Sequence, residues 1–258
     1  MNANPTELVA LRALIAISAA TVGGLLGMGR KRVGHRVLCG LVSLAAGALL
    51  AVTAVHIVPE TVEMIGWIPG MATVLVGTLV FAGIGKYVYF VCPACAASAT
   101  EHDSGYLRLG LLLIIAMGIH STVDGLAISA GSEVMSSIGV LILFAVSYHK
   151  VPEGLALVSV ARLAGYGRGK ALAITILVEL TTALGAFLGL AFLHHVSGFW
   201  IGAILGVVAG SFLYTVGFAL LKEMYAHEKG SIILYVVLGF VSMLTISSIV
   251  ARLGMHAH

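Results

Sequence analysis

Charged residues are scarce in this sequence: Asp, Glu, Lys and Arg together make up 10% of its 258 residues. A soluble domain usually carries about 25%. The apolar share is 60% and the mean hydropathy is +1.09, and the apolar stretches are too long for a soluble core. The lack of charge therefore excludes an ordinary soluble domain and indicates a membrane protein.

Cysteine is scarce as well. The three cysteines, Cys39, Cys92 and Cys95, do not suggest a disulfide framework. The alternation of apolar and polar residues that marks a membrane β-barrel is also absent. No cleavable signal peptide is convincing, because the first apolar stretch is long enough to span a bilayer. These absences favour a bundle of membrane helices.

Long apolar runs are what the sequence has in abundance. A spanning helix needs roughly 20 apolar residues, and its backbone must be satisfied within the helix itself. We predict eight spans, at residues 6–27, 37–59, 69–91, 106–130, 138–161, 170–193, 199–221 and 231–252. Because the loops between them are short, the prediction is an all-α membrane protein with a single transmembrane domain, residues 1–258.

Basic residues concentrate on alternate loops. Eleven of the fourteen Lys and Arg fall on one side of the predicted membrane: Arg30, Lys31, Arg32, Arg36, Lys86, Arg108, Arg162, Arg168, Lys170, Lys222 and Lys229. Loops rich in Lys and Arg remain in the cytoplasm. We therefore predict a multi-pass protein of the inner membrane with both termini outside.

A short motif occurs twice, on the fourth and fifth predicted spans. The sequence HSTVDGLA at 120–127 is echoed by HKVPEGLA at 149–156, both of the form His-x-x-x-acid-Gly-Leu-Ala. His120 and Asp124, like His149 and Glu153, are four residues apart, which places each pair on one helix face with Cβ atoms about 5–6 Å apart. The glycine after each acid permits close contact between helices.

The depth of these four side chains indicates their chemistry. Ionisable groups near the bilayer centre cost several kcal/mol each unless they are paired, and they mark ion pathways. A single buried histidine is usually only a hydrogen-bonding group, but two histidines and two carboxylates at matching depth form a four-ligand site. Such a site suits Zn²⁺ and admits Fe²⁺, Mn²⁺, Co²⁺ or Cd²⁺, whereas Mg²⁺ and Ca²⁺ prefer oxygen ligands alone.

Two further charges lie in the middle of predicted spans. Lys150 follows His149, and Glu179 lies on the sixth span. An unpaired lysine at this depth is costly, so we expect a salt bridge between Lys150 and Glu179 beside the metal. The pair either ties the fifth helix to the sixth or helps to exclude a second metal ion.

Two other groups of candidate ligands are weaker. His56, Glu60 and Glu63 near the outer end of the second span form either an acidic outer mouth or a solvated helix end. The third loop contains the thiols and polar groups of Cys92, Cys95, His102 and Asp103. That loop is either a soft-metal contact or a flexible polar segment, because a closed structural site needs four ligands at tighter spacing.

The two motifs resemble the signature helices of the ZIP (Zrt/Irt-like protein) metal transporters, with weaker support from HIVPE at 56–60 and VELTTALGA at 178–186. The resemblance implies a 3+2+3 arrangement in which helices one to three and six to eight form an inverted repeat around the metal-holding fourth and fifth. By position, the main transport site is matched by four residues, His120, Asp124, His149 and Glu153.

The resemblance also covers a second, adjacent metal site that some family members possess. Ser121, Lys150 and Glu179 match its positions, but here Ser121 replaces an amide and Lys150 replaces a carboxylate. The expectation is thus a single-metal site. The family further implies import into the cytoplasm by alternating access, with an elevator-like slide as one form of it.

The predicted function is therefore transport of a divalent transition metal, with the metal as substrate and no prosthetic cofactor. The partners are the metal ion and the lipid bilayer, without nucleic acid, and a homodimer is left open. A cation/proton exchanger is the first alternative. An intramembrane metallohydrolase is the second, although His-Glu-x-x-His and Gly-x-Ser-x-Gly are both absent, so we expect no enzyme.

Overall fold

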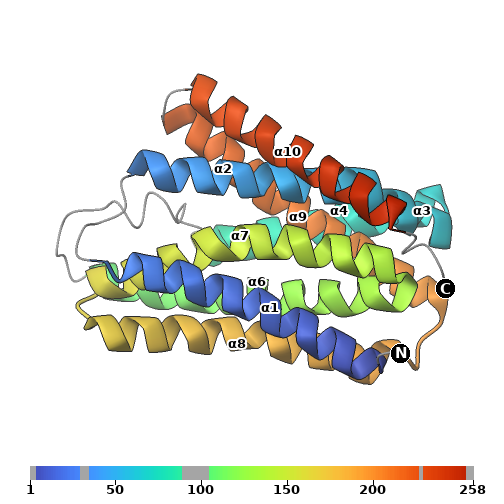
Figure 1. Ribbon diagram of the computed structural model, residues 1–258, viewed down its shortest axis with the longest axis horizontal. Coiled ribbons are helices and arrows are strands. Elements are labelled where there is room, and N and C mark those ends of the chain that lie inside the picture. Colours follow the sequence, from blue (N-terminus) through green and yellow to red (C-terminus); the bar gives the residue numbers. More distant parts are fainter. Residues whose placement is uncertain (1–3, 30–34, 89–104, 227–228, 254–258) are drawn as a thin grey trace.

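The computed structural model describes residues 4–29, 35–88, 105–226 and 229–253, and these residues form helices joined by short turns (Figure 1). The elements are α1 (Pro5–Gly27), α2 (His35–Val52), η1 (Thr53–Ile57), α3 (Val58–Ile65), α4 (Trp67–Val88), α6 (Gly105–Val134), α7 (Ser136–Leu163), α8 (Arg168–Leu193), α9 (Gly198–Ala226) and α10 (Lys229–Arg252). Within the described residues, eight helical segments are long and apolar enough to cross a bilayer. The prediction of an all-α protein with eight spans is confirmed.

The second span is longer than predicted. It was expected to end at residue 59, but α2, η1 and α3 form one continuous segment to Ile65. A proline inside an α-helix clashes with the carbonyl four residues earlier. Here the wider π-helical turn η1 directly precedes α3, whose second residue is Pro59, so the helix continues past the proline. It ends at Gly66, whose positive φ of 85° suits glycine.

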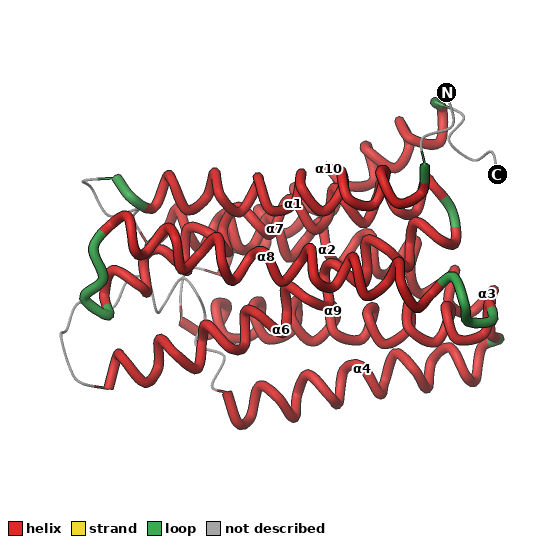
Figure 2. The backbone as a smooth tube through the Cα atoms, turned by 90° about the horizontal axis from the view of Figure 1, so that it is seen from below, coloured by secondary structure: helices red, strands yellow, loops and turns green. Residues whose placement is uncertain are grey.

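The helices form two groups; in Figure 1, α1, α6 and α8 of one group lie lowest, α2 and α10 of the other lie highest, and α4, α7 and α9 overlap between them. The motif group contains α1, α6, α7 and α8, and the frame group contains α2, η1, α3, α4, α9 and α10. The most extensive contacts are α6 with α8 and α1 with α7 in the motif group, and α2 with α10 and α4 with α9 in the frame group. Figure 2 shows the helices running side by side along the long axis, with their connections at the two ends.

Glycine explains why these particular pairs pack closely. In each pair both helices carry a glycine where a Cβ would overlap a backbone carbonyl oxygen of the other helix. The pairs are Gly23 with Gly154 (α1–α7), Gly125 with Gly185 (α6–α8), Gly47 with Gly239 (α2–α10) and Gly77 with Gly210 (α4–α9). Small residues allow membrane helices to approach because lipid supplies no hydrophobic force to press them together. All four pairs lie within a group.

A buried arginine fixes the turn between the motif helices. Only Met135 separates α6 from α7, so the two helices run antiparallel. Arg12 of α1 is buried and donates hydrogen bonds to the hydroxyl of Ser132 and to the carbonyl of Ser136, on the two sides of this turn. The arginine thereby ties α1 to both motif helices.

Candidate metal centre

Antiparallel packing of α6 and α7 brings the two motifs together. His120 and Asp124 lie on α6, and His149 and Glu153 lie on α7. All four side chains are buried, and one ligand atom from each lies within 4.8 Å of the others. Each helix contributes one imidazole and one carboxylate because a spacing of four residues keeps each pair on a single face.

The distances inside this cluster are close to those of a coordination shell. His149 Nε2 lies 3.1 Å from Asp124 Oδ2 and 3.9 Å from Glu153 Oε2. His120 Nε2 lies 3.8 Å from Asp124 Oδ2, and the centroids of the two imidazole rings are 5.4 Å apart. Two imidazoles and two carboxylates at these separations offer the mixed nitrogen and oxygen donors that divalent transition metals accept.

Three buried atoms of the motif residues have no hydrogen-bond partner among the described residues: His120 Nδ1, Asp124 Oδ1 and Glu153 Oε2. Of these, Glu153 Oε2 lies 3.0 Å from the ammonium of Lys150. A buried polar atom without a partner costs about 1–3 kcal/mol, so a bound cation would stabilise this arrangement. His149 is oriented differently: its Nδ1 donates to the carbonyl of Ala145 at 3.1 Å, which directs Nε2 into the cluster.

The ammonium of Lys150 is surrounded by acids. Its Nζ lies 3.0 Å from Asp124 Oδ2, 3.0 Å from Glu153 Oε2 and 2.9 Å from Glu179 Oε2. It also donates to the hydroxyl of Ser121 at 2.6 Å, and that hydroxyl donates to Glu153 Oε1 at 3.1 Å. The predicted pair of Lys150 with Glu179 is confirmed, but the contacts with Asp124 and Glu153 were not foreseen. The spacing of three between Lys150 and Glu153 was the available signal.

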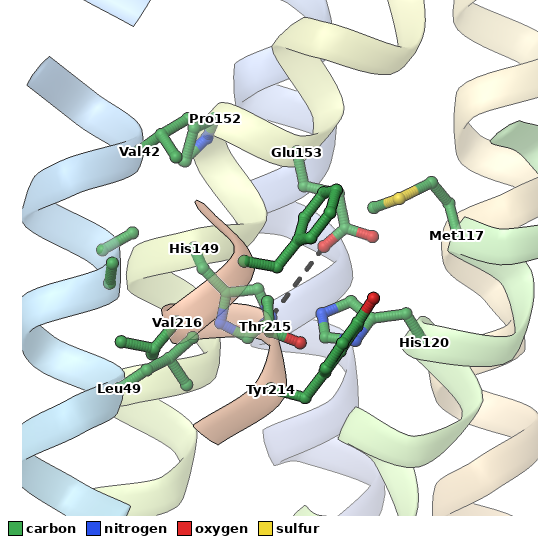
Figure 3. Close-up of a pocket in the computed structure, with 13 residues that line it drawn as sticks. Val42, Leu49, Met117, His120, His149, Pro152, Glu153, Tyr214, Thr215 and Val216 are labelled. Atoms are coloured by element: carbon green, nitrogen blue, oxygen red, sulfur yellow. Dashed lines mark ion pairs between the residues drawn. The ribbon is translucent and has the colours of Figure 1, made fainter. Parts of the chain in front are cut away.

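A cavity of about 100 Å³ opens from one side of the cluster. In Figure 3, the side chains of His120, His149 and Glu153 point into it, and the thioether of Met117 extends toward Glu153. The wall opposite comes from α2 (Val42, Ala45, Ala46, Leu49) and α9 (Tyr214, Thr215, Val216, Phe218), with Pro152 of α7. The sequence analysis did not find Met117, although it precedes His120 by three residues on the same face.

Packed apolar side chains also border the cluster. Phe212 of α9 is fully buried, and its ring lies 6.4 Å from that of His149 in an edge-on arrangement. Phe212 belongs to the same buried cluster as Leu205, Val208 and Val146. In this conformation, the metal-type cluster is thus bordered both by the cavity and by close-packed apolar side chains around Phe212.

The remaining candidates lie elsewhere. Within the described ranges, the metal-type cluster contains only the four motif residues. His56 lies in η1, where its Nε2 pairs with the hydroxyl of Ser247 on α10 at 2.8 Å. Glu60 is half-buried and Glu63 is exposed on α3, so the structure does not bring these acids to the cluster. Cys92, Cys95, His102 and Asp103 lie outside the described residues.

Comparison with known proteins gives a consistent result. The profile of the family described as "ZIP Zinc transporter" matches residues 93–247, which include both motif sequences. A protein of Chlorobium phaeovibrioides named "Zinc transporter ZupT" is 30% identical over 224 residues, covering 79% of this chain and 83% of the relative. A protein of the same name from Corynebacterium efficiens is 30% identical over 250 residues, covering 91% and 93%.

Proposed function

The chain belongs to the ZIP zinc transporter family, and from this premise we propose that it carries divalent transition-metal ions, Zn²⁺ first, through the cluster between α6 and α7. The family is one of transporters rather than enzymes, and the metal is the substrate. The proposal rests on one observation. Two imidazoles and two carboxylates are buried together, and one ligand atom of each lies within 4.8 Å of the others. Fe²⁺, Mn²⁺, Co²⁺ and Cd²⁺ fit the same donors.

The site holds one ion at a time. Lys150 places a fixed positive charge between Asp124, Glu153 and Glu179, where a second cation would otherwise have three carboxylates. With both histidines neutral, these three acids and Lys150 carry a net charge of two minus, which one divalent ion balances. Equilibrium binding should therefore give a stoichiometry of one Zn²⁺ per chain.

The conformation described here is open toward the cytoplasm. The cavity lies along the first half of the continuous span Arg36–Ile65, formed by α2, η1 and α3, and along the second half of α9, toward the end of the bundle where α1 finishes and α2 begins. Arg30, Lys31 and Arg32 of the sequence connect these two helices, and the positive-inside rule assigns such a loop to the cytoplasm. The start of α1 and the end of α10 lie at the opposite end (Figure 1), which is then the outer side of the inner membrane.

Transport then proceeds by alternating access, with import into the cytoplasm. The close glycine contacts lock helices within the motif group and within the frame group, and none of the glycines with such a contact joins the two. The interface between the groups is formed instead by α7 against α2 and α10 and by α6 against α9 and α4, and apolar side chains are buried along it. A slide of the motif group, carrying the metal, along the frame group would leave both sets of glycine contacts intact.

The test is uptake of radioactive Zn²⁺ into proteoliposomes by Asp124→Ala and Glu153→Ala. Each change removes a charged ligand, and the loss of about 1.4 kcal/mol of binding free energy weakens affinity about tenfold. We therefore expect uptake and equilibrium Zn²⁺ binding to fall at least about tenfold. Glu133→Gln, on the same helix as Asp124 but outside the cluster, is the matched control. Transport that survives both alanine changes would remove the proposed site. Proton-linked cation movement without measurable Zn²⁺ binding would favour the exchanger.

A further inference from the structure

The two walls of the open cavity belong to different helix groups. The motif-group wall carries the imidazoles and one carboxylate of the cluster, whereas the frame-group wall comes from α2 and α9. Among the described residues of the frame-group wall, all side chains are apolar except Tyr214 and Thr215 of α9. An ion that leaves the cluster into this cavity therefore meets two side-chain hydroxyls on the frame side.

The position of Tyr214 along α9 places it on the way out of the cluster. The ring of Phe212 lies 6.4 Å from that of His149, so this part of α9 is level with the cluster. Tyr214 and then Phe218 follow in the direction of the end assigned to the cytoplasm, and both line the cavity. In Figure 3 the phenol of Tyr214 extends from α9 in the direction of His120. Tyr214 thus lies between the cluster and the mouth of the cavity.

The two hydroxyls of this wall are held differently. Thr215 donates its hydroxyl proton to the carbonyl of Ser211 in its own helix, at 2.9 Å. The ring of Tyr214 is stacked on that of Phe218, with centroids 5.9 Å apart and planes at 20°. Aromatic rings four residues apart lie on one helix face and attract each other. The stack fixes the ring of Tyr214, and a phenol hydroxyl both donates and accepts hydrogen bonds.

Release of a metal ion is an exchange of ligands. As the ion leaves the cluster, water replaces its protein ligands one after another. The cavity of about 100 Å³ has room for several water molecules, but its apolar walls offer them few partners. A water that bridges the ion and a protein hydroxyl is nearly as favourable as a direct hydrogen bond. A hydroxyl beside the cluster therefore stabilises the first step of the exchange.

We propose that Tyr214 is the release residue of the frame group: its hydroxyl holds the first water that replaces a cluster ligand on the leaving ion, and Phe218 positions it by stacking on its ring. This rests on the proposed function, which it deepens by assigning a residue to the release step. Tyr214 belongs to the frame group and the cluster to the motif group. A slide of the motif group would carry the cluster away from Tyr214, so the hydroxyl acts only in the conformation that opens to the cytoplasm.

The rate of Zn²⁺ release from the purified full-length protein tests this role. The loaded protein is mixed with excess chelator in a stopped-flow instrument, a fluorescent zinc indicator reports dissociation, and equilibrium affinity is measured on the same samples. Tyr214→Phe removes the hydroxyl and keeps the ring. Tyr235→Phe, the same change on α10 and outside the cavity, is the matched control. Thr215→Val removes the other hydroxyl of the wall.

We expect Tyr214→Phe to slow dissociation about tenfold, the effect on a rate of one lost hydrogen bond beside a cation. Its affinity should stay close to that of the parent, because the hydroxyl acts on the ion in transit and binding slows with release. Thr215→Val and Tyr235→Phe should release Zn²⁺ at the parent rate. An unchanged rate in Tyr214→Phe, or equal slowing in Thr215→Val, would overturn the proposal. So would weaker affinity with faster dissociation, because the hydroxyl would then hold the bound ion.

A second substitution tests the positioning role of Phe218. Phe218→Leu removes the stacked ring and keeps an apolar side chain. It should slow dissociation in the parent but add nothing in Tyr214→Phe, because both changes then remove the same contact. Equal slowing in the two backgrounds would assign Phe218 to packing and overturn its positioning role.

The proposed function and the release role fail on different results. A parent protein without measurable Zn²⁺ binding would remove the metal site itself and the release step with it. A parent that binds Zn²⁺ and releases it no faster than Tyr214→Phe would remove the role of Tyr214 alone.

Discussion

The ammonium of Lys150 lies 2.9 Å from the carboxylate of Glu179, and both side chains are completely buried. The same ammonium touches one oxygen of Asp124 and one of Glu153, the two acids of the metal-type cluster. Asp124 Oδ1 has no hydrogen-bond partner among the described residues. The Oδ2 atom of Asp124 that contacts Lys150 also lies 3.1 Å from His149 Nε2. Lys150 thus compensates the charge of the acids and helps to fix their position beside the imidazoles.

Lys150→Met should make the stability of the protein depend strongly on metal. Removing one partner from a buried charge network costs about 3–5 kcal/mol, because the remaining charges lose their compensation. A bound Zn²⁺ partly replaces the lost positive charge, so we expect a lower thermal midpoint without metal and a larger rise on adding Zn²⁺ than in the parent. Thermal unfolding in detergent with chelator or Zn²⁺ measures both.

Lys86→Met is the control for this experiment, because Lys86 lies exposed in the last turn of α4. It should leave the midpoint and its response to Zn²⁺ unchanged. An identical Zn²⁺ response in Lys150→Met and the parent would show that Lys150 does not share its acids with the ion.

Gly154→Ala should weaken the α1–α7 contact. A Cβ at this position overlaps the carbonyl oxygen of Ala20, so the two helices have to separate. Overpacking of this kind typically costs about 1–3 kcal/mol, which should appear as a lower midpoint of unfolding. Gly83→Ala is the matched control, since nothing lies within 4 Å of its added Cβ. Equal midpoints for the two variants would contradict the close contact.

Met117→Leu should shift metal preference. The Met117 thioether lies in the wall of the open cavity and extends toward Glu153 (Figure 3). Sulfur is a soft donor that favours Cd²⁺ over Mn²⁺, and leucine keeps the volume without the sulfur. We expect the ratio of Cd²⁺ to Mn²⁺ uptake to fall several-fold, mainly through slower Cd²⁺ transport. Met243→Leu, buried away from the cavity, should leave the ratio unchanged, and an unchanged ratio in both would assign Met117 to packing alone.

Much of the fold was predictable because a bilayer leaves few choices. Apolar runs of spanning length must be helices, so eight spans followed from hydropathy. The four-residue spacing in 120–127 and 149–156 put each histidine beside its acid because α-helices repeat every 3.6 residues. The echo of the two motifs, on consecutive antiparallel helices, then implied that the four side chains meet.

Tertiary structure alone decided which helices pair and what surrounds the cluster. Lipid-facing and helix-facing residues are equally apolar, so composition did not reveal that α1 packs on α7 or that α6 packs on α8. The continuation of α2 through η1 past Pro59 depends on a local widening of the helix that no periodicity marks. The three acids around Lys150 come from α6, α7 and α8, and the cavity opens among α2, α6, α7 and α9. Both depend on how separate helices pack, and the order of residues along one helix does not determine the distance to another.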